Sequence, residues 1–391
     1  MRKIFLLTLL VLNFIIFPSQ VLATDKNSSS QFSLQDAIEN IDLDVLEEYK
    51  NKIDGEINSC MGRKTVKDWL VDFAKGEWNF DFKEIGESIM RFFFKEIIAN
   101  SSLLGKLLIL SVVAALLINL QNSFSSSVAQ MSYLVCFLAL CAIALGSFRI
   151  VLEIGQQTIE NMVAFMMGML PQMLVITAGL GGVNTSVLLF PVLMTAAAAF
   201  ANAIKNIVFP LIIMSAILNL VNQMSETLKV ERLAKFFGQM AQLSLGFFFT
   251  IFVGVVTLRA LYASVLDKIA LRTAKFVSDN AIPIIGKMFS ETLEVAAGYL
   301  MMIKQALGIL GLLIIFGLIV FPLLKIAAIS IIYKAAAAIA EPLGDSRTAV
   351  FLETMGSHLL LMLAAVASVA LMFFIMIAVV IGMSSHPGMF G

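Results

Sequence analysis

The feature that most constrains this chain is its set of long runs of apolar residues. The run LLLMLAAVASVALMFFIMIAVVIG, residues 359–382, contains no charged side chain. About 20 apolar residues in a helix are enough to cross the hydrocarbon core of a bilayer. Because lipid offers no hydrogen-bond partners to backbone N–H and C=O groups, each such run must form a helix. The sequence therefore predicts an all-α, polytopic membrane protein.

Composition supports the same class. Of the 391 residues, 59% are hydrophobic and 14% are charged, whereas soluble domains have about 45–50% and about 25%. The formal net charge is zero, so the chain lacks the basic surplus that is typical of nucleic-acid binding. Some of the candidate spans are weak, so we expect about six to nine spans in all. The candidates are residues 103–120, 131–148, 162–180, 186–204, 207–224, 241–258, 306–324, 326–340 and 358–382.

The N-terminus has the layout of a secretory signal peptide. Two basic residues, Arg2 and Lys3, precede an apolar run that Pro18 ends. Small residues follow, and they predict cleavage after Ala23, so that residues 1–23 are the signal peptide. The alternative is an anchor that stays uncleaved. In both cases the segment that follows is expected outside the cytoplasm.

Residues 24–100 are more polar than the rest and carry an excess of acidic side chains. Apolar residues at helical spacing predict helices from Leu34 to about Ile53, from Thr65 to Ala74 and from about Asp81 to Asn100. We interpret this region as an exported, acidic, mainly helical domain. At about 75 residues it buries only a modest core, so we expect it to lean on the membrane or on a partner. Residues 101–391 then form the multi-span membrane domain.

A charged stretch interrupts the membrane domain near residues 259–298. Lys268, Arg272, Lys275 and Asp279 recur at helical spacing and form one stripe. The sequence IPIIG follows, and its proline disfavours helix immediately before it. The pattern predicts an amphipathic helix in the headgroup region and a re-entrant segment after it. A solvated connector and a gate or docking ledge remain alternative interpretations.

Two lysines in the later spans, Lys325 and Lys334, raise a separate question. A charge at membrane depth is costly and often faces a cavity. A lysine can instead extend its stem so that the ammonium group reaches the interface. The sequence leaves both interpretations open, and we treat the two lysines as candidate cavity-lining residues.

The sequence contains none of the motifs that would indicate an enzyme. It has no phosphate-binding Gly-Lys-Ser/Thr loop, no nucleophile elbow and no paired acids. Its two histidines and three cysteines lack metal-site spacing. Cys60 lies in the polar domain and is either a packing residue or a partner in an intermolecular disulfide. We therefore expect no catalysis, no cofactor and no metal.

The charged stretch also carries a resemblance to a known family. LRTAKF at residues 271–276, then Asn280, the Ile-Pro pair, Gly286 and Met288-Phe289 resemble the core of the stage III sporulation protein AE family. The segment FPLLK…IYKAAAAI…PLG, Phe321 to Gly344, is similar to that family too. The order of signal peptide, exported domain and spans along the chain also resembles that of the family. The resemblance covers almost the whole mature chain.

This resemblance implies a protein of endospore-forming bacteria, in the mother-cell membrane around the engulfed forespore. The family is expected to act in a multi-protein channel or feeding complex that reaches a forespore membrane protein across the intermembrane space. A stand-alone secondary transporter and a structural scaffold are the alternatives. The family supplies no catalytic residues, only signature positions that are candidates for a gate or docking site: Arg272, Lys275, Asn280, Pro283, Gly286 and Phe289.

Overall fold

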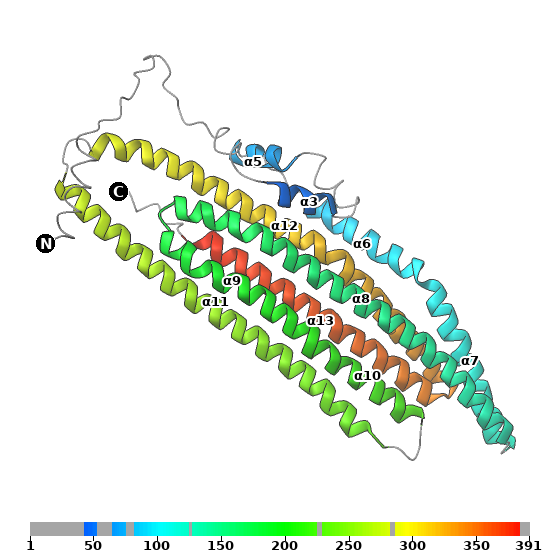
Figure 1. Ribbon diagram of the computed structural model, residues 1–391. Coiled ribbons are helices and arrows are strands. Elements are labelled where there is room, and N and C mark those ends of the chain that lie inside the picture. The colour runs from blue at the N-terminus through cyan, green and yellow to red at the C-terminus, as the bar shows by residue number, and fades with distance from the viewer. Residues whose placement is uncertain are drawn as a thin grey trace.

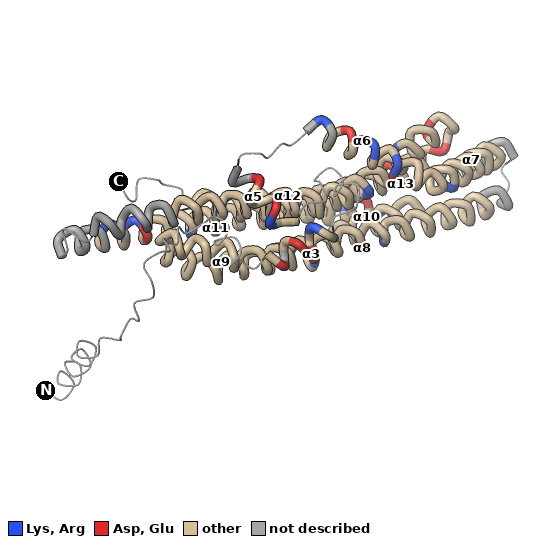
Figure 2. The backbone as a smooth tube through the Cα atoms, turned by 90° about the horizontal axis from the view of Figure 1, so that it is seen from above, with Lys and Arg blue, Asp and Glu red and all other residues tan. Residues whose placement is uncertain are grey.

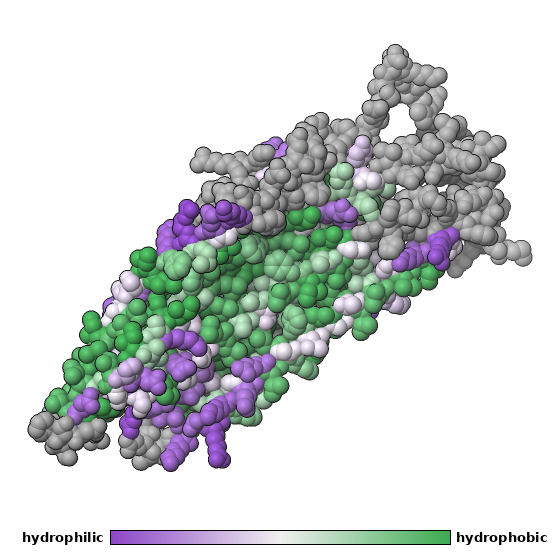
Figure 3. All heavy atoms as spheres, turned by 180° about the vertical axis from the view of Figure 1, so that it is seen from behind, coloured by the Kyte–Doolittle hydropathy of each residue, from purple (hydrophilic) through white to green (hydrophobic). Residues whose placement is uncertain are grey.

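The computed structural model describes residues 43–52, 65–75, 82–124, 127–224, 229–281 and 286–383. Within these ranges the chain forms helices and no strands. The long helices run side by side in one elongated bundle (Figure 1). Most of their length is free of Lys, Arg, Asp and Glu (Figure 2). Seen from behind, a broad hydrophobic surface crosses the helices and is bordered by hydrophilic residues (Figure 3).

Six helical segments in the described ranges are long and apolar enough to cross a membrane, which agrees with the lower end of the predicted count. They are Ser101–Leu120, Met131–Gly179, Val183–Met224, Glu231–Ala270, Ala297–Leu343 and Ser346–Gly382. The helices that carry them are α7 (Ser101–Phe124), α8 (Ser127–Gly179), α9 (Val183–Ala203), α10 (Phe209–Met224), α11 (Glu231–Ala281), α12 (Gly286–Ala340) and α13 (Ser346–Gly382).

Several spans that the sequence separates belong to one continuous helix. The predicted pair 131–148 and 162–180 lies on α8, and 306–324 and 326–340 lie on α12. The π-helical turn η1 (Ile204–Val208) joins α9 to α10 without a break. With 53 residues, α8 is about 80 Å long, against about 30 Å for the hydrocarbon core. One bilayer therefore encloses only part of it.

Helices α12 and α13 form the most extensively packed pair of the bundle. Glycines on α12 permit this close approach. A Cβ atom added at Gly308 would overlap the side chain of Ile381 on α13, and one added at Gly311 would overlap Met169 on α8. The glycines therefore leave the space that the side chains of Ile381 and Met169 occupy.

Three shorter helices, α3 (Asp44–Lys52), α5 (Val66–Lys75) and α6 (Phe82–Ala99), pack on the outside of the bundle. The Tyr49 ring meets Phe165 of α8 at 5.4 Å between centroids, and Phe92 meets Phe321 of α12 at 4.4 Å. These described parts of the polar domain share one apolar core with the long helices. The domain thus leans on the bundle, while its export stays a prediction. The signal peptide with Ala23, and Cys60, lie outside the described residues.

The glycine contact gives a stability prediction. Replacing Gly308 by Leu forces side-chain atoms into the α12–α13 contact, and overpacking of this kind costs about 1–3 kcal/mol. We expect a lower midpoint of thermal unfolding for the detergent-purified protein. Gly298→Leu on the same helix is the matched control, because a Cβ there meets no atom within 4 Å. Equal midpoints for the two variants would contradict this account of the packing.

Candidate functional site

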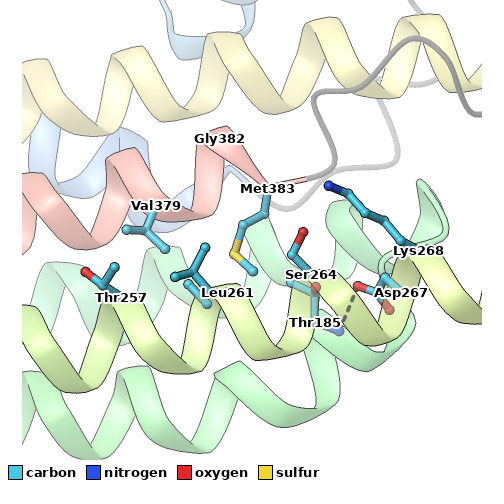
Figure 4. A pocket seen from close by; sticks show the side chains of 10 residues that line it. Thr185, Thr257, Leu261, Ser264, Asp267, Lys268, Val379, Gly382 and Met383 are labelled. Carbon is cyan, nitrogen blue, oxygen red and sulfur yellow. Dashed lines mark hydrogen bonds between the residues drawn. The ribbon is translucent and has the colours of Figure 1, made fainter.

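A cavity of about 250 Å³ lies where α9 begins and α13 ends. Helix α11 supplies most of its wall, α13 contributes its last turn, and α9 contributes its first turn (Figure 4). The lining combines apolar side chains with hydroxyl groups, one carboxylate and one ammonium group. The lining residues are Thr185, Thr257, Ala260, Leu261, Ser264, Asp267, Lys268, Val379, Gly382 and Met383.

Asp267 of α11 caps the start of α9. Its two carboxylate oxygens accept hydrogen bonds from the backbone N–H groups of Asn184, at 2.8 Å, and Thr185, at 3.0 Å. The first N–H groups of a helix have no partner within the helix, and a negative charge there is stabilised by the helix dipole. Asp267 is only 4% exposed, and the start of α9 compensates its buried charge. The cap therefore ties α9 to α11.

Lys304 of α12 plays the complementary role at the end of α13. Its ammonium group donates a hydrogen bond to the backbone carbonyl of Met383, the C-cap residue of α13. A cation near the C-terminus of a helix is favourable. Lys304 is only 2% exposed, so this carbonyl provides polar contact for a buried ammonium group. One end of the bundle thus combines an acidic cap with a basic cap.

The opposite end of α13 is held by a second buried acid. Asp345 is fully buried and accepts a hydrogen bond from the N–H of Thr348, at 3.1 Å. The hydroxyl of Tyr133 on α8 donates to the same carboxylate oxygen at 3.2 Å. Helix α13 is therefore capped at its start by Asp345 and at its end by Lys304.

A hydroxyl and an imidazole link three helices between these ends. Ser215 of α10 donates to the carbonyl of Ala234 on α11 at 2.8 Å, and its oxygen lies 2.8 Å from Nε2 of His358 on α13. The other ring nitrogen of His358 lies 2.7 Å from the Thr354 carbonyl. These bonds give the polar groups partners inside the apolar bundle.

Of the predicted signature positions, Arg272 has a described side chain, and it lies beyond the cavity. Lys268 lines it, and Arg272, one turn further along α11, is exposed. The predicted stripe is helical, because α11 continues to Ala281. Pro283 and the side chains of the other signature positions Lys275, Asn280 and Phe289 lie outside the described residues, while Gly286 begins α12. Their grouping as a gate or docking site, and the re-entrant segment, stay predictions.

The two candidate cavity-lining lysines lie on α12. Lys325 and Lys334 are both half-buried, and neither lines the cavity described above. The Cγ atom of Lys334 would lie 3.0 Å from a Cβ added at Gly356. The stem of Lys334 therefore packs on α13, and the hypothesis that either lysine faces a water-filled path stays a prediction.

Sequence reasoning missed the capping roles of Asp267 and Lys304. Asp267 is separated from Thr185 by 82 positions, and Lys304 from Met383 by 79. A lone acid in a basic segment and a lone lysine at a span edge have no pattern that points to a distant helix end. Only the packing of α9, α11, α12 and α13 brings these groups together.

Six candidate crossings, a continuous apolar core and charged side chains that cap helix ends define a polytopic helical membrane protein. The family described as Stage III sporulation protein AE matches residues 64–384. The chain is also 34% identical over 342 residues to "Stage III sporulation protein AE" of Bacillus subtilis (strain 168), a match that covers 87% of this chain and 86% of the relative. The chain belongs to the stage III sporulation protein AE family. No solved structure matches it significantly.

The capping geometry predicts a local effect of Asp267→Ala. Loss of an N-cap acceptor costs about 0.5–2 kcal/mol, so we expect the first turn of α9 to open more often. Hydrogen exchange followed by mass spectrometry should show faster exchange in the peptide that contains Asn184 and Thr185. The control is Arg272→Ala, an exposed position on the same helix. Unchanged exchange in the Asp267 variant would show that the cap contributes nothing.

Proposed function

We propose that the chain is a non-enzymatic, integral membrane component of the channel or feeding complex that links the mother cell to the engulfed forespore. The observation that carries this proposal is the family match over residues 64–384 on a polytopic helical fold. We place the protein in the mother-cell membrane. Its role would be to support forespore development by forming or bracing a passage.

The chemistry of the cavity supports a role without catalysis. A catalytic carboxylate needs free access to a substrate atom, but both oxygens of Asp267 already accept backbone N–H groups. The ammonium group of Lys304 is likewise bonded to a helix end. These charges hold helices in place, which suits a component that positions a passage.

The proposed partners are other membrane proteins of the stage III complex and, indirectly, a protein of the forespore membrane. Residues 24–100 would face the intermembrane space. Support comes from the charged outer surface that α3 and α6 form beside the bundle. On α3 this surface includes the exposed residues Asp44, Glu48 and Lys52. Such a surface suits contacts with a water-soluble domain.

A stand-alone secondary transporter is the second candidate. The cavity of about 250 Å³, with hydroxyl groups beside apolar side chains, favours it because small solutes bind in sites of this mixed character. Purified protein in liposomes distinguishes the two. A transporter carries solute alone, whereas a component of a complex is inactive without its partners.

Deletion of the gene in its own host tests the leading proposal. We expect sporulation to arrest after engulfment, with small or collapsing forespores in membrane-dye microscopy. Restoring the wild-type gene should rescue the spores. Normal spores in the deletion strain would overturn the proposed function and favour the transporter.

A double charge reversal tests the signature segment. Arg272→Glu with Lys275→Glu inverts the basic edge of α11, so a gate or docking contact that depends on this charge should fail. We expect spore counts to fall to those of the deletion strain while immunoblots show a normal protein level. The matched control is Arg232→Glu with Lys235→Glu, at the other end of α11. Normal sporulation of the Arg272 and Lys275 double variant would sink the gate or docking interpretation.

A further inference from the structure

The cavity between α9, α11 and α13 lies where two charge-free stretches end. Residues 236–258 of α11 contain no charged side chain, and residues 359–382 of α13 contain none either. The first stretch is about 34 Å long, which is close to the thickness of the hydrocarbon core of a bilayer. Thr257 and Gly382, near the ends of these stretches, both line the cavity. The cavity therefore lies at the level where apolar surface gives way to charged residues.

Helix α11 presents this cavity to the outside of the bundle. Leu261 of the cavity wall and the adjacent Tyr262 are 61% and 57% exposed, and tyrosine favours the headgroup level of a membrane. Only 22% of the most apolar window of Glu231–Ala270 is buried, so lipid can cover this side. The polar helices α3, α5 and α6 pack chiefly against α8 and α12, on another side of the bundle (Figure 1).

The charges in and behind the cavity wall are compensated in the protein, except for one. The carboxylate of Asp267 accepts the N–H groups at the start of α9. The ammonium group of Lys304 donates to the carbonyl at the end of α13. Lys268 also lines the cavity and is exposed, and it has no ion-pair or hydrogen-bond partner in the part of the chain that the structure describes. One positive charge therefore stands at the cavity without a counterion from the described residues.

The lining around this charge has a polar end and a more apolar end. The ammonium group of Lys268 and the hydroxyl of Ser264 point toward the same space beside the last turn of α13 (Figure 4). Leu261 and Val379 line the other end, together with Thr257. Leu261 is seven residues before Lys268, or about 10 Å along α11. The cationic end thus adjoins the charged part of α11, and the apolar end adjoins its charge-free part.

We propose that the cavity binds an anionic phospholipid, with the phosphate against the ammonium group of Lys268 and an acyl chain against Leu261 and Val379. Lysine binds phosphate as a compact point charge, and the hydroxyl of Ser264 can donate to a phosphate oxygen. Basic pockets beside membrane helices bind anionic headgroups in this way. Asp267 does not repel the phosphate strongly, because the start of α9 compensates its charge.

The path for the acyl chain follows one face of α11. Leu261, Gly254 and Gly246 are spaced by seven and eight residues, so they share this face. A Cβ atom added at Gly254 or Gly246 would meet no atom within 4 Å, so the bundle leaves the surface open there. A second hollow, which Gly246 and Thr250 help to line, lies on the same face. A water-soluble phosphate has no use for this apolar path, which favours a lipid.

Native mass spectrometry of the full chain, purified in detergent, tests this site. The protein is titrated with dioleoyl phosphatidylglycerol and, separately, with the zwitterionic dioleoyl phosphatidylcholine, and the bound lipids are counted. Lys268→Gln removes the charge, Lys268→Arg keeps it, and Ser264→Phe fills the cavity. The matched control is Arg259→Gln, because Arg259 is exposed and lies two and a half turns from Lys268, on the opposite face of α11.

We expect the first phosphatidylglycerol to bind several-fold more tightly than phosphatidylcholine. This preference should vanish in Lys268→Gln and persist in Lys268→Arg and Arg259→Gln, and Ser264→Phe should weaken the binding of both lipids. Equal losses from Lys268→Gln and Arg259→Gln, or unchanged binding by Ser264→Phe, would overturn the proposal. Displacement of the lipid by an equal concentration of glycerol 3-phosphate would overturn it too, because the site would then hold a free phosphate. The assay measures lipid binding and not spore formation, so its outcome is independent of the proposed function.

Discussion

The capping of helix ends by charged side chains is the interaction on which the described bundle depends. A helix end inside an apolar bundle leaves N–H or C=O groups that water cannot reach. Asp345 satisfies the start of α13, Lys304 its end, and Asp267 the start of α9. Because Asp267 and Lys304 come from neighbouring helices, each cap also fixes one helix against another. The costly charges in this protein are therefore part of its architecture.

This arrangement explains how the cavity and the signature segment are related. Asp267 is fixed by α9, and Lys268 beside it lines the cavity. Arg272 follows one turn later on the same helix, exposed. The basic edge of α11 therefore continues from a point that two backbone hydrogen bonds hold in place. A contact made at Arg272 therefore acts on a segment of α11 that is anchored to α9. The same segment lines the cavity, whose wall also includes the end of α13.

The sequence predicted the helical membrane class and the helical nature of residues 268–279, because apolar runs and periodic charges are local signals. It divided α8 and α12 wrongly into separate spans. Arg149, Glu153 and Glu160 interrupt an apolar run, but they lie on one exposed face and leave the helix intact. The caps could not be predicted from the sequence, for a different reason. The partners of Asp267 and Lys304 are about 80 positions away, so they emerge only from the packing of the helices.

Burial differs sharply among the crossing segments, and the difference indicates which helices are central and which are peripheral in the bundle. Half of the most apolar window is buried in Ala297–Leu343 and in Ser346–Gly382, but only 22% in Ser101–Leu120 and in Glu231–Ala270. The central pair is thus covered more fully by the rest of the chain, while α7 and α11 expose apolar surface that lipid can cover. The polar side chains on the outer face of α8 differ from this periphery, because they are paired along the helix surface, Arg149 with Glu153 and Gln157 with Asn161. An apolar periphery fits helices that meet lipid, whereas α12 and α13 find more of their neighbours within the chain.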